Sequence, residues 1–308
     1  MGGCRPPGEP ATESTPPPPE VVSADPRKLT IRQAGPARAF LGNGYLGVNA
    51  SPLGWARDGG QALPGFISGF YQNESLAVAP EWAAPDIRIG GVSLNTRGAR
   101  DYEQTLDLRR GLLHTRYRWR GKPEVEVEAI LFPARHSPYL GVLRIVLKPR
   151  RNTRVTLFGA TVVPRGCAVS LWDTAAAGDA APQPWPAYEA ELKAGETWTF
   201  TRYAGVCAER DLSQAQRERL ARNAVAEAKR AGFDGVVQAH TAAWEKLWQR
   251  NLAIEGDPHT QQVLNAFRYY LLASVRAGRA DSVPPMGISS DIYQGHIFWD
   301  ADTWIFPA

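Results

Sequence analysis

The chain has 308 residues, of which 44% are hydrophobic and 21% charged, and its formal net charge is +4. These values are typical of one large or two ordinary globular domains, and they exclude a fully disordered or fibrous protein. No apolar run reaches the ~18 residues of a membrane span, and the N-terminus has no apolar core of a secretory signal. We therefore expect no membrane partner.

Residues 1–27 are rich in proline and almost free of aliphatic side chains, so we predict a disordered tail. The three cysteines, Cys4, Cys167 and Cys207, are widely spaced and form no CxxC pair. An odd number of distant cysteines favours reduced thiols over a disulfide framework, which predicts a cytoplasmic protein. The densest basic run, KPRRNTR at 148–154, lies between two apolar stretches and indicates a solvated turn, so we expect no nucleic-acid partner.

Residues 28–207 show the pattern of short strands. GLLHTRYRWRG alternates apolar and polar side chains, and EVEVEAILFP places Val125, Val127, Ala129 and Leu131 on one side. Further apolar runs follow, separated by Gly, Pro and Asn and without helical periodicity. Many strands in about 180 residues predict antiparallel sheets stacked as a large β super-sandwich.

The pattern becomes helical near residue 211, and we predict a helical linker over 208–256. One helix is expected from a cap at Asp211 to Gly232, and a second from Asp234. The second helix places these residues on one face: Val236, His240, Trp244, Leu247 and Trp248.

Residues 257–308 are predicted to begin an α-helical domain. Asp257 is the expected N-cap and Pro258 lies in the first turn. The residues expected to face inward are Leu264, Phe267, Tyr270, Leu271 and Val275. One helix cannot bury its own apolar stripe, so we expect a fragment or truncated isoform.

The motif GNGYLG at 42–47 matches the dinucleotide pattern GxGxxG. That pattern binds a pyrophosphate only between a strand and a helix, and no helix is predicted here. A tight hairpin is the better interpretation, with Asn43 and Gly44 at positive φ. No nucleotide cofactor is expected.

The stretch HIFWDADTW at 296–304 concentrates polar and aromatic side chains close to the end of the chain. It contains His296, Phe298, Trp299, Asp300, Asp302 and Trp304. Buried carboxylates are costly unless they have a partner or a function. Single aromatic residues near a helix are usually core and paired aspartates are often caps. The whole cluster, however, offers flat faces for stacking and acceptors for hydroxyl groups, which indicates a sugar site.

Several stretches together resemble glycoside hydrolase family 65, over essentially everything after the tail. They are NGYLG, LDLRRGLLHTRYRW (106–119), the WxxxW of 244–248, IEGDPHTQ (254–261) and GHIFWDADTWIFP (295–307). The resemblance implies a β super-sandwich, a helical linker and the start of an (α/α) six-hairpin toroid barrel.

The resemblance also implies roles for the residues of HIFWD. Trp299 and Asp300 would line the pocket for the cleaved sugar, with Phe298 and His296 beside them. Family members invert, using two separated carboxylates. The general acid is a Glu expected beyond residue 308, so this chain alone is expected to be inactive. Asp302 is a candidate either for orienting Asp300 or for the hydrolytic machinery. No metal and no cofactor are expected.

The continuation Asp-Ala-Asp-Thr-Trp is closer to the hydrolases of the family than to its phosphorylases. It implies removal of α-linked glucose from the Glc-Gal disaccharide on collagen hydroxylysine, so the expected partner is a small carbohydrate or glycopeptide. Three alternatives stay open. They are a disaccharide phosphorylase, a non-catalytic carbohydrate-binding protein, and a glycosyltransferase that holds a metal between Asp300 and Asp302.

Overall fold

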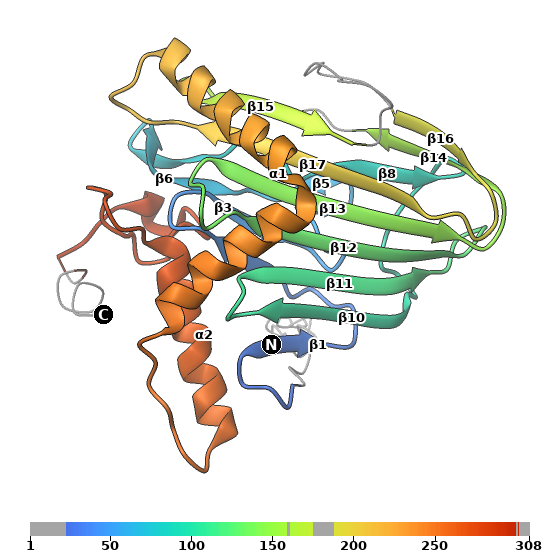
Figure 1. Cartoon of the computed structure of the whole chain (residues 1–308), viewed down its shortest axis with the longest axis horizontal. Coiled ribbons are helices and arrows are strands. Elements are labelled where there is room, and N and C mark those ends of the chain that lie inside the picture. The colour runs from blue at the N-terminus through green and yellow to red at the C-terminus, as the bar shows by residue number, and fades with distance from the viewer. Residues whose placement is uncertain (1–22, 159–160, 175–187, 300, 302–308) are drawn as a thin grey trace, which may run out of the picture.

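The computed structural model describes residues 23–158, 161–174, 188–299 and 301. Within these residues, strands come first along the chain and helices follow. Seven strands form one antiparallel sheet in the order β1-β10-β11-β12-β13-β17-β15 (Figure 1). Their bounds are β1 (Lys28–Ile31), β10 (Arg100–Asp107), β11 (Leu112–Trp119), β12 (Val125–Pro133), β13 (Leu140–Pro149), β17 (Trp198–Cys207) and β15 (Ala168–Asp173).

The sequence alternation of β12 builds the core as predicted. Val125, Val127, Ala129 and Leu131 are at most 2% exposed, because successive side chains of a strand point to opposite faces of the sheet. The glutamates between them point outward and are exposed. This pattern leaves one apolar face, which needs a second layer to cover it.

That second layer consists of smaller sheets. Four strands pair in the order β16 (Tyr188–Leu192), β14 (Thr153–Phe158), β8 (Asp86–Ile89) and β9 (Val92–Ser93). The layer also contains three separate two-stranded hairpins. They pair β2 (Ala39–Gly42) with β3 (Gly47–Ala50), β4 (Arg57–Asp58) with β5 (Gln61–Ala62), and β6 (Phe66–Gln72) with β7 (Ser75–Val78). Large aromatic side chains such as Trp55, Trp82 and Phe200 fill the core and are at most 1% exposed. The predicted β super-sandwich is confirmed.

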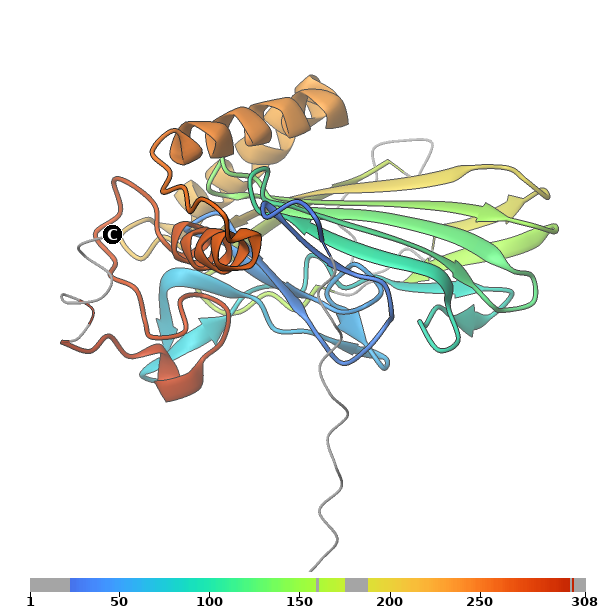
Figure 2. The same ribbon diagram turned by 90° about the horizontal axis from the view of Figure 1, so that it is seen from below.

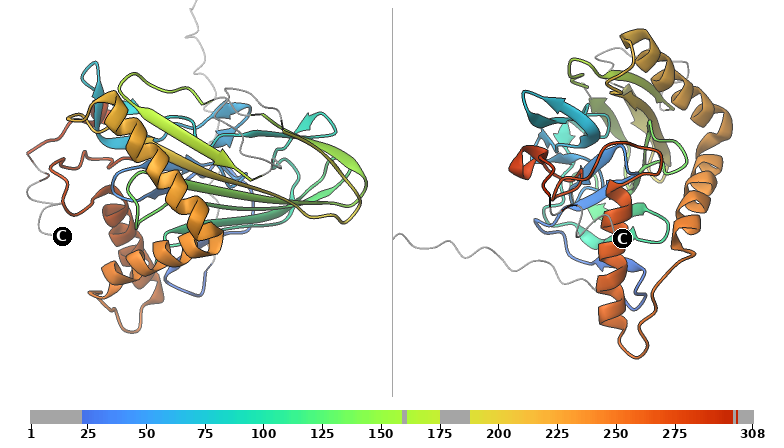
Figure 3. Two further views of the ribbon diagram at one scale, coloured as in Figure 1. Left: turned by 45° about the horizontal axis from the view of Figure 1, so that its top comes forward. Right: turned by 90° about the vertical axis from the view of Figure 1, so that its left-hand side faces the viewer.

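Helix α1 (Gln214–Trp248) packs on the outer face of the seven-stranded sheet, against β15, β17 and β13 (Figure 2). Its N-cap is Ser213, not the predicted Asp211, because Ser213 and Gln216 exchange the two hydrogen bonds of a capping box. Gly232 takes φ 67° and breaks the helix where the sequence predicted. The second half of α1 continues in a different direction (Figure 3).

That second half buries His240 against the sheet. The His240 Nδ1 atom accepts from the Arg135 N–H at 2.9 Å, and its Nε2–H donates to the Gly111 carbonyl at 3.2 Å. Both ring nitrogens are therefore satisfied by a neutral imidazole. Burial lowers the pKa of His240 to about 3. His240 belongs to the junction between helix and sheet.

Helix α2 (Pro258–Ser274) has the predicted cap, since the Asp257 carboxylate accepts from the Thr260 N–H at 3.0 Å. The prediction of its inward face is wrong for Phe267 and Tyr270, whereas Leu264, Leu271 and Val275 are half-buried. Phe267 is 71% exposed and Tyr270 38% exposed. The buried stripe instead consists of Asn265, Tyr269, Ala273 and Ser274. The short 3₁₀ helix η1 (Ile292–Gly295) follows after a long loop. The domain boundaries after residues 27, 207 and 256 remain predictions.

The motif GNGYLG forms the turn of the hairpin β2–β3, as expected. Gly44 takes φ 81°, but Asn43 does not take a positive φ. Asn43 is fully buried, and its Oδ1 accepts from the backbone N–H groups of Tyr45 and Leu46. Its amide nitrogen donates to the carbonyls of Ala134 and Pro138, both at 3.0 Å. The asparagine therefore closes the turn with its side chain rather than with its backbone.

Candidate functional site

The predicted site residues lie at the edge of the molecule, after η1. His296 is exposed, Phe298 is 42% exposed and Trp299 is 81% exposed. The predicted residues Asp300 and Asp302 lie outside the described residues, as does Trp304. Trp299 is the most exposed of the large hydrophobic side chains that the structure describes, and its ring offers an uncovered flat apolar face.

A tight loop precedes these residues. Tyr293 (φ 58°, ψ 27°) and Gln294 (φ 59°, ψ 15°) are both left-handed, and Gly295 follows at φ 68°. The ring of Tyr293 meets the ring of Phe298 edge to face, with centroids 5.9 Å apart. This ring contact closes the loop and leaves Trp299 as the next residue. The loop therefore fixes the backbone position from which the Trp299 side chain extends.

The loop is held against the hairpin β6–β7 (Figure 3). The Tyr71 hydroxyl donates to the Gly295 carbonyl at 2.7 Å, and the His296 Nε2–H donates to the Glu74 carbonyl at 2.9 Å. A Cβ atom at Gly295 would lie 2.5 Å from the Cβ atom of Leu76, so only glycine fits there. His296 therefore binds the sandwich and has only its second ring nitrogen for another partner.

The segment between α2 and η1 also follows the sandwich. Arg276 donates to the carbonyls of Asn43 and Arg135 at 3.2 and 2.8 Å. Further along, the Asn49 amide donates to the Ser289 carbonyl at 2.8 Å. Arg279 is paired with Glu209 at 2.7 Å. The predicted site segment is thus attached to the β2–β3 and β6–β7 hairpins over most of its approach.

Sequence analysis missed these hairpin residues. Tyr71 and Glu74 precede their partners by 224 and 222 positions, and neither belongs to a recognisable motif. The glycine before His296 is the one signal that was present, because it permits the close approach of Leu76. A glycine alone does not say which strand approaches it.

The arrangement of described residues supports binding rather than acid–base chemistry. Trp299 and Phe298 present apolar ring surface, and His296 supplies a polar edge. Sites of this kind bind ligands by combining apolar walls with a few placed polar groups. Within the described ranges, no three His, Cys, Asp or Glu side chains gather so as to hold a metal ion.

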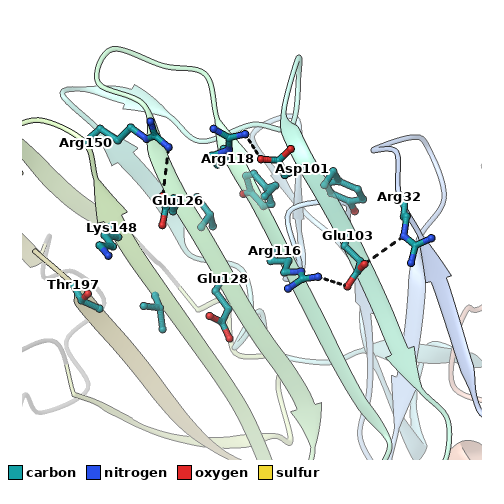
Figure 4. A pocket seen from close by; sticks show the side chains of 14 residues that line it. Arg32, Asp101, Glu103, Arg116, Arg118, Glu126, Glu128, Lys148, Arg150 and Thr197 are labelled. Atoms are coloured by element: carbon teal, nitrogen blue, oxygen red, sulfur yellow. Dashed lines mark hydrogen bonds and ion pairs between the residues drawn. The ribbon is translucent and has the colours of Figure 1, made fainter. Parts of the chain in front are cut away.

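A cleft of about 850 Å³ lies elsewhere, on the outer face of β10–β13 (Figure 4). Its charges pair across the strands: Arg116 lies 3.0 Å from Glu103, Arg32 lies 3.4 Å from Glu103, and Arg118 contacts Asp101. Cross-strand pairs of opposite charge stabilise an exposed sheet face. The cleft is therefore interpreted as a solvated sheet surface, separate from the candidate site.

The basic run at 148–154 forms the expected exposed turn between β13 and β14. Arg150 lies 2.9 Å from Glu124, and Arg154 lies 2.6 Å from Glu191. These arginines are paired within the chain. Among the residues that the structure describes, no helix has the length and hydropathy needed to cross a membrane.

Comparisons with known proteins identify the family and the fold to which this chain is similar. Residues 33–162 and 166–247 match the profile described as "Glycosyl hydrolase family 65, N-terminal domain". A kojibiose hydrolase of Mucilaginibacter mallensis is 36% identical over 121 residues, covering 39% of this chain and 18% of that protein. A protein-glucosylgalactosylhydroxylysine glucosidase of Dictyostelium discoideum is 40% identical over 74 residues, covering 24% of this chain and 10% of that protein.

The fold is also found in a solved structure, described as a putative kojibiose phosphorylase from human microbiome. It has a TM-score of 0.79 at 15% identity, covering 94% of this chain and 47% of that chain. This likeness confirms the predicted sandwich followed by helices. The chain spans less than half the length of that structure, and the aligned parts span less than a fifth of the two similar enzymes.

Proposed function

This chain belongs to glycosyl hydrolase family 65, and from that premise we propose that it supplies one wall of the glucose pocket of an α-glucosidase. One observation carries the proposal: the ring of Trp299 is 81% exposed, at the end of a constrained loop, directly before Asp300 in the sequence. A flat apolar ring beside a carboxylate suits the two faces of a sugar, which is apolar along its C–H bonds and polar along its hydroxyls.

In this proposal, Trp299 stacks on the glucose ring and Phe298 supports it. The Asp300 carboxylate accepts hydrogen bonds from two adjacent hydroxyl groups, and charged acceptors of this kind form the stronger hydrogen bonds. Asp302 either orients Asp300 or belongs to the hydrolytic machinery. His296 has its Nε2–H committed to Glu74, so it contributes at the rim of the pocket through its other nitrogen.

The proposed reaction is hydrolysis with inversion at the anomeric carbon. A carboxylate base takes a proton from water as that water attacks C1. A carboxylic acid gives a proton to the leaving glycosidic oxygen, so an α-linked substrate yields β-glucose. The proposal assigns the general acid to no residue of this chain, so it gives the chain sugar binding and negligible activity alone. No metal or cofactor takes part.

The proposed substrate is the α-linked glucose of Glc-Gal-hydroxylysine in collagen, and the cytoplasm is the expected compartment. The sequence Asp-Ala-Asp-Thr-Trp and the similar glucosidase of Dictyostelium discoideum support the hydrolase over a phosphorylase. The fold likeness to a protein described as a putative phosphorylase keeps phosphorolysis as the second candidate. A non-catalytic carbohydrate-binding role is the third.

Binding of the disaccharide tests the proposal on this chain directly. We expect Glc-α-1,2-Gal-hydroxylysine to bind in calorimetry, and Asp300→Asn to weaken binding by about tenfold or more, since hydrogen bonds to charged groups contribute strongly. Asp291→Asn is the matched control, because Asp291 is exposed and its side chain makes no capping bond. Equal affinity in the two variants would contradict the assignment of Asp300.

The reaction is tested on a chain that continues past residue 308, with and without phosphate and EDTA. Release of free glucose that is independent of both additives is the expected result. Glucose 1-phosphate would move the protein to the phosphorylases. A reaction that requires a metal and a nucleotide sugar would overturn the hydrolase assignment.

A further inference from the structure

The hairpin β6–β7 contacts the candidate site segment on both sides of one peptide bond. Tyr71 donates to the carbonyl of Gly295, and the Glu74 carbonyl accepts from the imidazole of His296. Leu76 occupies the space where a side chain at 295 would lie. Two hydrogen bonds and one close packing contact therefore fix both the position and the orientation of the Gly295–His296 peptide.

The backbone just before this peptide is in a conformation that L-residues avoid. Tyr293 and Gln294 are consecutive left-handed residues, and neither is glycine. Such conformations persist only where the surroundings hold them. The hydrogen bond from Tyr71 acts one residue after Gln294, so it is placed to oppose relaxation of the loop.

Any relaxation of the loop would reach Trp299. The ring contact between Tyr293 and Phe298 makes residues 293–298 a closed unit, and Trp299 is attached at its end. With 81% of its surface exposed, Trp299 has few contacts of its own to hold it. Its place in space therefore depends on the loop, and the loop depends on the hairpin.

We propose that the β6–β7 hairpin is a positioning element of the sugar site, and that Tyr71 is the positioning residue that holds Trp299 in its binding orientation. This inference rests on the proposed function, because it gives Trp299 a sugar to bind. It assigns to the sandwich a direct part in forming the pocket wall. Tyr71 itself touches no substrate and acts through Gly295.

The test uses the 308-residue chain labelled with 5-fluorotryptophan. Trp299→Phe identifies the Trp299 line among the ten fluorine resonances of the tryptophans. In Tyr71→Phe, which removes only the hydroxyl, we expect that line to shift by more than its width. We also expect affinity for the disaccharide to fall about fivefold, as the loss of one hydrogen bond predicts.

The matched control is Tyr102→Phe. The Tyr102 hydroxyl also donates to a backbone carbonyl, that of Pro52 at 3.1 Å, and it lies in the sandwich core. This variant loses an equivalent bond and tests general destabilisation. Its Trp299 line is expected to stay in place.

A rescue variant separates positioning from simple loss of stability. Glycine adopts the left-handed conformation of Gln294 without a steric penalty, so Gln294→Gly removes the strain at residue 294 and leaves that of Tyr293. The double variant Tyr71→Phe/Gln294→Gly is expected to regain the original Trp299 line and most of the sugar affinity. A merely structural role of Tyr71 would not be restored by a change at residue 294.

Two outcomes would overturn the inference. An unmoved Trp299 line in Tyr71→Phe would show that the hairpin does not set its orientation, and an equal shift in Tyr102→Phe would show a general effect. Failure of the proposed function gives a different result. In that case saturating disaccharide leaves the Trp299 line of the unsubstituted chain unchanged, while the response to Tyr71→Phe still decides the positioning.

Discussion

His240 makes the stability of this protein depend on pH in a calculable way. Its imidazole is neutral in the folded state, with a pKa lowered by burial from 6.5 to about 3. Between these two values the unfolded chain binds one proton more than the folded chain, so stability falls as the pH falls. Each pKa unit corresponds to about 1.4 kcal/mol. Lowering the pH from 7 to 5 is therefore expected to reduce the free energy of unfolding by about 2 kcal/mol through His240 alone.

The variant His240→Gln isolates this contribution. Its amide nitrogen can still donate to the Gly111 carbonyl, but its side chain does not titrate. Urea denaturation followed by circular dichroism at pH 7 and pH 5 gives the free energy of unfolding of both proteins. The other four histidines and all carboxylates are common to the two chains, so their effects cancel in the difference.

The expected result is that the original chain loses about 2 kcal/mol more than His240→Gln between pH 7 and pH 5. The variant is less stable at pH 7, because the Arg135 N–H loses its acceptor. Equal losses in the two proteins would refute the reasoning, since they would mean that His240 is not held neutral by burial at the helix–sheet junction.

Three further substitutions test other parts of the fold. Asn43→Ala leaves the buried groups that the side chain satisfied without partners, and it should lower the free energy of unfolding by about 3 kcal/mol or more in urea titrations; a loss below 1 kcal/mol would contradict the role given to this turn. Arg202→Met strands the carboxylate of Asp173, whose Oδ2 is 2.7 Å away in a buried pair, and it should cost about 3–5 kcal/mol. The double variant with Asp173→Leu should recover much of that loss, and an additive result would mean that the pair is not coupled. Burial raises the pKa of Asp107, so its ionisation lowers stability as the pH rises from about 4. Asp107→Asn keeps an acceptor for the Arg110 N–H and should be the more stable protein at pH 7, with its advantage vanishing in acid titrations below pH 4; an advantage unchanged by pH would argue against titration as the cause.

The sandwich could be predicted from sequence because strand alternation is a local signal. In β12 every second residue is apolar, and the structure buries those residues. Helix α2 shows why the buried face of a helix was harder to predict. Its sequence offers more than one apolar stripe, and the hairpin β2–β3 contacts the one that contains Ala273. A Cβ atom at Gly42 would lie 2.3 Å from the carbonyl oxygen of Ala273. Which face of α2 is buried therefore depends on the β2–β3 hairpin, and the sequence of the helix alone does not show where that hairpin packs.

The candidate site shows the same difference between local features, which the sequence predicts, and long-range contacts, which it does not. The aromatic and acidic residues of HIFWD stand next to each other in the chain, so a single sequence could single them out. The hydrogen bonds that hold them come from Tyr71 and Glu74, more than 200 residues earlier. Neither of these residues is unusual for a surface hairpin. Hydrogen bonds between common residues that lie far apart in the chain produce no recognisable pattern in a single sequence.

The attachment of residues 289–296 to the early hairpins also imposes an order on biosynthesis. Glu74 leaves the ribosome 222 residues before His296, its partner. At about 5–20 residues per second, the hairpin waits roughly 11–44 seconds for that partner. During this interval Leu76 and the uncovered edges of β6–β7 face solvent in the nascent chain, and they are open to chaperones or to neighbouring nascent chains. A segment made more than 200 residues later thus shields these early hairpins, so slow or interrupted translation near residue 290 is expected to increase aggregation.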